Sequence, residues 1–229
     1  NGKAGTDEGL GTPTNPVNNL VDAEAIASRE NLRAFSVLGD ITLNKEFSDW
    51  RFLGTVSKEA GSIDFNGYAC TRCSFTELEL TGDAGGSSLF VTDCTLVTLA
   101  NAIGVFRECG LTDVLTPGVS GKLTMVKCFS DIPGSITPVI DLAENLSDDL
   151  QVRGWHGGIE LRNVDIASQK VSLDVDSGHV VLDGTCTDGE VVLRGAGKLT
   201  IKAGFASTLD DEGFQASSDS TFGTQDRAL

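Results

Sequence analysis

The chain is poor in several residue types that mark common classes of protein. Its 229 residues include two His, one Met, one Tyr and 17 Lys plus Arg, against 33 Asp plus Glu, for a net charge of −16. This deficit of positive charge argues against nucleic acid or an anionic membrane as a partner. No run of 18 apolar residues is present, and the first 20 residues lack the basic-then-apolar plan of a signal peptide. We therefore expect no membrane insertion.

Cysteine is also sparse, with six residues in the chain, far below the density of a disulfide-stapled scaffold. Residues stacked on neighbouring strands hold their Cβ atoms about 4.8 Å apart, slightly beyond the spacing that a disulfide prefers. We therefore predict free, buried thiols. Cys70 and Cys73 form a CxxC pair, which also admits a zinc or redox site. No second pair accompanies it, and the only histidines are His156 and His179.

One short phrase recurs at residues 89–96, 105–111 and 123–129. It consists of an apolar or β-branched run, two mostly polar positions and a cysteine, followed within two residues by a large apolar residue. An earlier variant at residues 68–75 extends the series upstream. The intervals are 21 residues from Cys73 to Cys94, 15 to Cys109 and 19 to Cys128. Short β-type runs that return about every 20 residues are typical of a solenoid.

Such a run cannot bury its apolar face alone, but copies stacked about 4.8 Å apart enclose a continuous interior. We predict an all-β fold, a right-handed parallel β-helix, in which Cys94, Cys109 and Cys128 form one internal ladder. Between residues 159 and 201, apolar and polar residues alternate strand after strand, as expected for strands with one face inside. An ordinary β-sandwich with short strands remains the alternative, because the repeat spacing is irregular.

The ends of the chain differ from its repetitive middle. Residues 1–15 form a non-periodic arm or linker, and Asn15-Pro16 suggests a helix N-cap followed by proline at the first helical position. We predict a β-helix over residues 16–205, with a capping helix at 16–30 that covers the first coil. Residues 206–229 are predicted to be a C-terminal tail or end cap. Prolines and glycines at residues 131–149 interrupt the rhythm and indicate a bulging loop or a wider coil.

Some β-helices carry polysaccharide hydrolases or lyases, which need carboxylates a few ångströms apart. The outward candidates here are Glu160, Asp165, Asp174, Asp176 and Asp183. Asp174 and Asp176 share one strand face at a separation of about 7 Å, which suits an inverting pair or a weak calcium site. Acidic residues are also common on the solvent-exposed face of a strand, where they need no functional explanation.

Two further groups of residues admit a functional or a structural interpretation. Arg162 and Arg194 are isolated basic candidates, and surface salt bridges would also explain them. Trp155 and His156 stand between glycines and could stack on a sugar, but packing of Trp155 inside the coil is favoured. We expect no catalytic, cofactor-binding or metal-ligating residue, no cofactor and no enzymatic activity.

The N-terminal part carries a resemblance to a known class of proteins. Residues 11–23 (GTPTNPVNNLVDA), a short helix, then residues 35–43 (FSVLGDITL) and 50–54 (WRFLG) follow in this order. This order resembles the β-helical part of tailed-phage virion proteins, such as tail fibres and tailspike-like appendage components. The resemblance covers about the first 55 residues. It implies a structural virion role, frequently as a homotrimer, and it transfers no catalytic motif to named positions.

These observations lead to one expected function and two alternatives. We expect a non-enzymatic component of a phage virion, a tail fibre or other appendage, that is assembled in the host cytoplasm. Its expected partners are copies of itself, other tail or baseplate proteins and a host-surface glycan. The alternatives are a glycan-cleaving tailspike domain and a secreted bacterial adhesin, although adhesins tend to avoid cysteine. Five phenylalanines could supply a face for trimer contacts: Phe52, Phe65, Phe106, Phe129 and Phe214.

Overall fold

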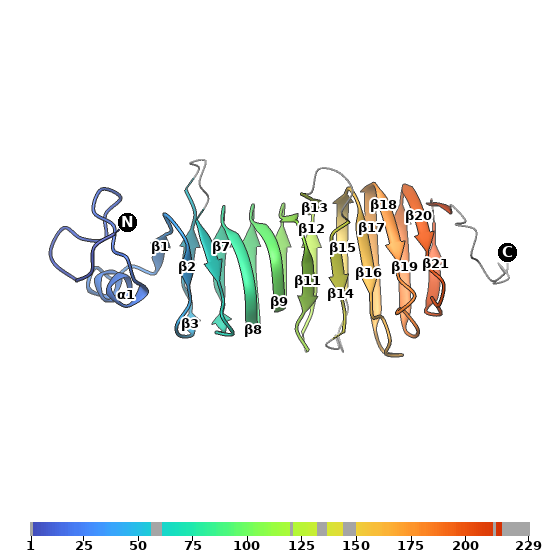
Figure 1. Ribbon diagram of the computed structural model, residues 1–229, viewed down its shortest axis with the longest axis horizontal. Coiled ribbons are helices and arrows are strands. Elements are labelled where there is room, and N and C mark those ends of the chain that lie inside the picture. Colours follow the sequence, from blue (N-terminus) through green and yellow to red (C-terminus); the bar gives the residue numbers. More distant parts are fainter. Residues whose placement is uncertain are drawn as a thin grey trace.

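The computed structural model describes residues 2–55, 61–119, 121–131, 137–143, 150–212 and 214–216. One helix, α1 (Leu20–Arg29), precedes a long stack of short strands (Figure 1). Every pair of named strands in the described part is parallel, and the described residues run from α1 at one end of the stack to the last strands at the other. The predicted parallel β-helix with a single N-terminal helix is thereby confirmed. The helix is too short and too polar to span a membrane.

One side of the solenoid is a continuous ladder, here called ladder A, in which each strand pairs with the next. In order, its strands are β1 (Ala34–Ser36), β4 (Arg51–Leu53), β7 (Cys73–Thr76), the C-terminal parts of β8 (Glu79–Thr92) and β9 (Thr95–Arg107), β12 (Leu123–Val126), β15 (Leu150–His156), β17 (Lys170–Ser177), β19 (Glu190–Gly195) and β21 (Thr208–Asp211).

The other sides of the coils are built from shorter strands and from the N-terminal parts of β8 and β9. The shorter strands are β2 (Ile41–Thr42), β3 (Phe47–Ser48), β5 (Ser62–Asp64), β6 (Cys70–Thr71), β10 (Gly110–Leu111), β11 (Val114–Pro117), β13 (Phe129–Ser130), β14 (Val139–Asp141), β16 (Ile159–Arg162), β18 (His179–Leu182), β20 (Gly197–Ile201) and β22 (Phe214–Ala216).

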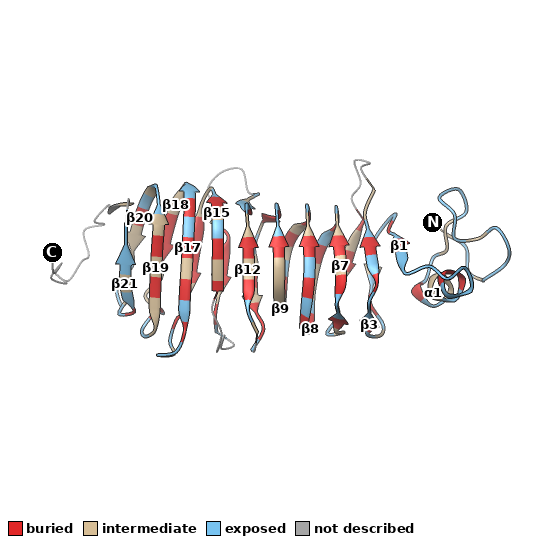
Figure 2. Ribbon diagram, turned by 180° about the vertical axis from the view of Figure 1, so that it is seen from behind, coloured by how far each residue is buried: buried red, intermediate tan, exposed pale blue. Residues whose placement is uncertain are grey.

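Period-two alternation turns every second residue of ladder A into the core, and Figure 2 shows the resulting alternation of buried and less buried positions along most of these strands. One inward row is buried from β1 to β19 and consists of Phe35, Phe52, Phe75, Val91, Phe106, Met125, Val152, Leu173 and Leu193. Its first members are aromatic: the rings of Phe52 and Phe75 stack with centroids 5.0 Å apart, and Phe35 lies 5.4 Å from Phe52. Such ring pairs add stability beyond the area that they bury.

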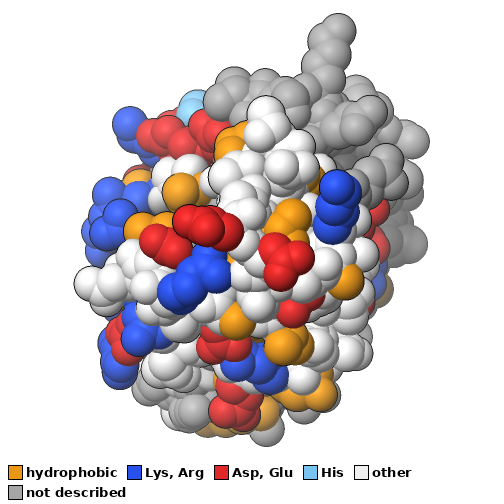
Figure 3. All heavy atoms as spheres, turned by 90° about the vertical axis from the view of Figure 1, so that its left-hand side faces the viewer, with side chains coloured by type: hydrophobic (Ala, Val, Ile, Leu, Met, Phe, Trp, Pro, Cys, Tyr) orange, Lys and Arg blue, Asp and Glu red, His pale blue; other side chains and the backbone are white. Residues whose placement is uncertain are grey.

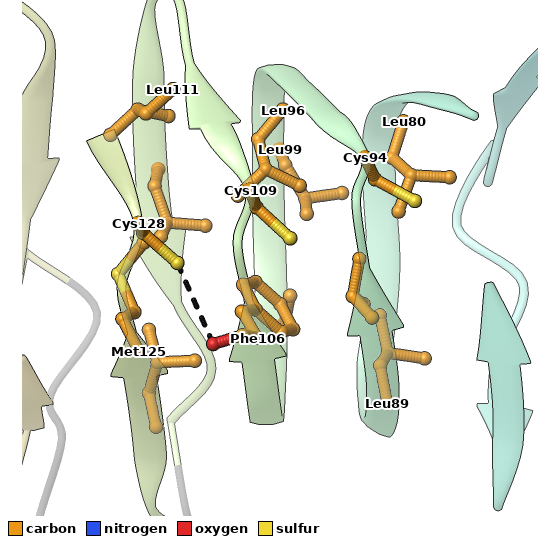
Figure 4. Packing of buried hydrophobic residues seen from close by; sticks show 14 of the residues in the cluster. Leu80, Leu89, Cys94, Leu96, Leu99, Phe106, Cys109, Leu111, Met125 and Cys128 are labelled. Carbon is orange, nitrogen blue, oxygen red and sulfur yellow. Dashed lines mark hydrogen bonds between the residues drawn. The ribbon is translucent and has the colours of Figure 1, made fainter. Parts of the chain in front are cut away.

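The predicted cysteine ladder is present in the core. Gly110 pairs with both Thr95 and Phe129, which places Cys109 between Cys94 and Cys128. All six cysteines are free and buried, as predicted. Figure 4 shows the three thiols side by side among leucines, with a hydrogen bond of 3.5 Å from Cys128 Sγ to the Phe106 carbonyl.

The variant of the repeat at residues 68–75 lies in a different register and is not part of this ladder. Cys73 pairs with Leu89, and the register of Glu79 with Thr95 puts Leu78 next to Cys94. Cys73 therefore begins a strand of ladder A, whereas Cys94 lies at a corner beyond the end of one.

The helix begins four residues later than the predicted start at residue 16. Its N-cap is Asn19, whose Oδ1 accepts a hydrogen bond of 2.8 Å from the Asp22 amide. Asn15 instead closes a turn, with its amide bonded to the carbonyl of Thr12. The helix buries Leu20, Ile26 and Ala27, as expected of a cap on the first coil. The arm before it is tied back by bonds from the Gly5 amide to Asp22 and from Arg29 to the Thr6 carbonyl.

The C-terminal boundary also differs from the prediction. The β-helix does not end at residue 205, because β21 pairs with β19 and β22 pairs with β20. The rest of the predicted tail lies outside the described residues. In the predicted interruption at 131–149, the described part includes β14, which sits in register between β11 and β16. Residues 132–136 and 144–149 lie outside the description.

Candidate functional site

The sequence-predicted carboxylates fall into two separate groups. In the first, Lys202 Nζ lies 2.9 Å from both Glu160 Oε1 and Asp183 Oδ2, and Arg162 Nε lies 2.6 Å from Glu160. Glu160 is only 8% exposed, and two cations compensate its charge. Burial alone would raise the pKa of Asp183, but hydrogen bonds from Lys202 and Thr185 lower it to about 2. These groups bridge successive rungs and have the character of a structural ion network.

The second group surrounds His156. Its Nε2 lies 3.1 Å from Asp176 Oδ2, and its Nδ1 lies 3.5 Å from the hydroxyl of Ser177. This set resembles a Ser-His-Asp triad in residue type, but the side chains of His156 and Asp176 are 54% and 52% exposed. A triad needs a buried carboxylate to orient the imidazole, and water competes for this one.

The remaining acidic and basic candidates do not join a common site. Asp174 lies in register with Arg194, and Arg194 pairs with Asp210 at 2.7 Å. Arg162 and Arg194 therefore both take part in salt bridges. Asp165 uses its amide to bind the side chain of Gln169. Within the described ranges, no three His, Cys, Asp or Glu side chains gather closely enough to hold a metal ion.

The CxxC pair and the tryptophan are both internal. Cys70 and Cys73 are buried, and their mutual hydrogen bond raises the pKa of Cys70 and lowers that of Cys73. Trp155 is fully buried and donates a hydrogen bond of 3.3 Å to the Gly158 carbonyl, which confirms the packing interpretation. His156, its neighbour in sequence, is exposed on the opposite side of the strand.

The phenylalanines expected on a contact face are mostly internal. Phe52, Phe65 and Phe106 are fully buried, and Phe214 packs against the core. Phe129 is 37% exposed, while Phe90, which was not among the candidates, is 52% exposed. Sequence reasoning missed Phe90 because its neighbours Leu89 and Val91 are also apolar, so that the alternation is blurred.

Phe90 belongs to a surface of unusual composition, here called face A. Face A comprises the outward residues of ladder A from β4 to β15: Arg51, Leu53, Ser74, Thr76, Phe90, Thr92, Val105, Arg107, Thr124, Val126, Gln151 and Arg153. No residue on this face is acidic, although the chain has 33 Asp plus Glu.

Apolar and basic residues alternate along face A, with Arg107 in register between Thr92 and Val126. Phe90 and Val105 are register neighbours, and Arg107 stacks on Val126, which in turn stacks on Arg153. Arg153 donates a hydrogen bond to Gln151. No carboxylate in the described part of the chain forms an ion pair with Arg51, Arg107 or Arg153. The face is thus a flat β surface with exposed aromatic and aliphatic groups and three unneutralised guanidinium groups.

A hollow of about 470 Å³ lies at the N-terminal end, between the arm, α1 and the first coil. Leu32 and Leu38 lie on its walls and are 54% and 46% exposed. Figure 3 views this end of the molecule and shows charges of both signs among scattered apolar side chains. The hollow has no concentration of one kind of chemistry.

Comparison with protein-family models, curated proteins and solved structures finds no match to this chain.

Proposed function

We propose that the chain is a non-enzymatic structural component of a phage virion, a tail fibre or other tail appendage that assembles as a homotrimer. In this role it contacts other tail or baseplate proteins and a host-surface glycan. The N-terminal sequence resemblance supplies the virion context. The fold supports a structural role because a stack of coils that advances in one direction, from α1 to the last strands, suits a rigid spacer.

Face A is the observation that carries the assembly part of this proposal. The centres of protein interfaces are enriched in aromatic residues and arginine and depleted of Asp and Glu. Face A has this composition, with Phe90 at 52% exposure and Leu53 at 37% exposure in a strongly acidic chain. Left in water, such a surface gains nothing from its apolar groups, whereas burial against a partner does.

The test is the mass of residues 1–229 in solution, measured by multi-angle light scattering over a range of concentrations. The same sample is then screened for cleavage of bacterial surface polysaccharides. A trimer without cleavage is expected. A monomer throughout the range would contradict self-assembly, and polysaccharide cleavage would contradict the non-enzymatic role.

A further inference from the structure

The turns that carry face A also carry an acidic surface on their other sides. Residues 61–71, 77–88, 93–103 and 108–119 contain no Lys or Arg. Their acidic residues, here called the acidic strip, are Asp64, Glu77, Glu79, Asp83, Asp93, Glu108 and Asp113. Asp64 is half-buried and the others are exposed. No basic residue in the described part of the chain pairs with any of them.

The two surfaces lie at the same height along the solenoid. Strand β8 contributes Glu79 and Asp83 to the acidic strip and Phe90 to face A. Strand β9 contributes Val105 and Arg107 to face A, and the corners on either side of it hold Asp93 and Glu108. Two copies placed side by side without a shift along the axis can therefore bring the two surfaces into contact.

Charge decides which surfaces meet. If face A packed against face A of another copy, Arg107 and Arg153 would lie close to the arginines of that copy. Like charges across an interface are costly. Contact between face A and the acidic strip neutralises both surfaces and buries Phe90, Leu53 and Val105. An interface between two different surfaces of one chain closes into a ring when the rotation from each copy to the next is a whole fraction of a full turn, as around a three-fold axis.

We propose that face A of one copy packs against the acidic strip of a second copy of this chain at the same height. This inference rests on the proposed function, since it names the contact that holds the trimer together. The occupant of face A is a second copy because the complementary surface lies on the chain itself, on the same turns.

Substitutions that change the charge of each surface, alone and combined, test the contact. The variant Arg107→Glu with Arg153→Glu changes the net charge of face A from +3 to −1, and Glu79→Lys with Asp113→Lys lowers the negative charge of the acidic strip from −7 to −3. Each double variant is expected to raise the dissociation constant of the trimer by roughly 100-fold. The quadruple variant leaves negative charge on both surfaces, −1 against −3, and is therefore expected to stay dissociated. Light scattering gives the mass, and circular dichroism shows that each variant is folded.

A matched pair of apolar variants tests the apolar part of face A. Phe90→Ser is expected to give folded monomers, whereas Leu32→Ser, at an equally exposed leucine outside face A, is expected to remain trimeric. If the parent chain is a trimer and both charge-altered double variants stay trimeric, the proposed contact is wrong while self-assembly stands. If they stay trimeric but lose retention on an acidic polysaccharide column, face A binds glycan instead. A monomeric parent would overturn the contact together with the assembly.

Discussion

At the scale of single residues, the coil corners follow one backbone rule. Arg72, Asp93, Glu108 and Lys127 have φ between 53° and 55°, and each directly precedes a buried cysteine. A single left-handed residue turns the chain so that the next side chain points into the core. This conformation costs most L-residues about 1–2 kcal/mol, and Asn and Asp tolerate it better. The corners at Arg72, Glu108 and Lys127 therefore hold strain, which the packing behind them offsets.

Lys127→Asn is expected to relieve this strain. Asn tolerates the left-handed region better than Lys, so the free energy of unfolding should rise by up to about 1 kcal/mol. Urea unfolding monitored by circular dichroism measures this change. Lys122→Asn, at an exposed position without a positive φ, is the matched control and should change little. A loss of stability in Lys127→Asn would contradict the account of the corners.

Single residues also show what a sequence pattern can and cannot predict about the core. The position of the thiols in the core was predictable, because three cysteines recur at the same place in a repeated phrase. The direction of each phenylalanine was not, because a shift of one residue moves a side chain to the other face. Where Leu89, Phe90 and Val91 follow one another, the sequence holds no alternation to fix the register. Face A was therefore invisible until the strands were placed.

At the scale of elements, Lys202 joins neighbouring strands through their carboxylates. Glu160 comes from β16, Asp183 follows β18, and Lys202 follows β20, so that one ammonium group spans three rungs. Lys202 is separated from Glu160 and Asp183 by 42 and 19 residues in the sequence, so no local motif reveals the network. The sequence predicted the outward carboxylates, but only the register reveals that a lysine lies between two of them.

Asp183→Asn is expected to lower the free energy of unfolding in a pH-dependent way. The pKa of Asp183 is lowered in the folded chain from 3.8 to about 2, so its ion pair contributes fully above pH 3.8 and is lost as the pH falls toward 2. The expected loss is about 1–2 kcal/mol at pH 7 and near zero at pH 2. Chemical unfolding of parent and variant at several pH values measures it, with Glu46→Gln at an exposed position as control. A difference that stays constant across this range would argue against the ion pair.

The first residue of the helix could not be predicted from the sequence. Asn15 and Asn19 are both suitable N-cap residues, and Pro16 favours the earlier start. The later start wins because Asn19 also reaches Asp22 through its Nδ2, which locks the first turn from two sides. The existence and role of the helix were predictable from its periodicity, whereas its first residue depends on side-chain bonds that propensity does not encode.

At the scale of the whole molecule, each coil contacts mainly its neighbours. Stability in such a stack is close to a sum of coil and neighbour contributions, so damage at one end need not reach the other. Phe52→Ala removes a ring from the aromatic stack near the N-terminal end, at an expected cost of about 3–5 kcal/mol. Leu193→Ala makes a cavity in β19, near the other end, at an expected cost of about 2–5 kcal/mol.

Hydrogen exchange measured by mass spectrometry distinguishes the two variants. Phe52→Ala is expected to lose amide protection around β1, β4 and β7 while β17 and β19 retain it, and Leu193→Ala should do the reverse. Equal loss of protection along the whole chain in both variants would show that the coils unfold as one cooperative unit.

The direction of the hydrogen bonds has a mechanical consequence. The backbone hydrogen bonds between the described coils run along the long axis, and the described part of the chain enters the stack at one end of that axis and leaves it at the other (Figure 1). Tension applied along this axis would act first on the outermost coil and would detach the coils one after another. The force required would be that needed to detach a single coil. Compression or bending, in contrast, presses many coils together at once. We therefore expect the stack to resist compression along its axis better than tension.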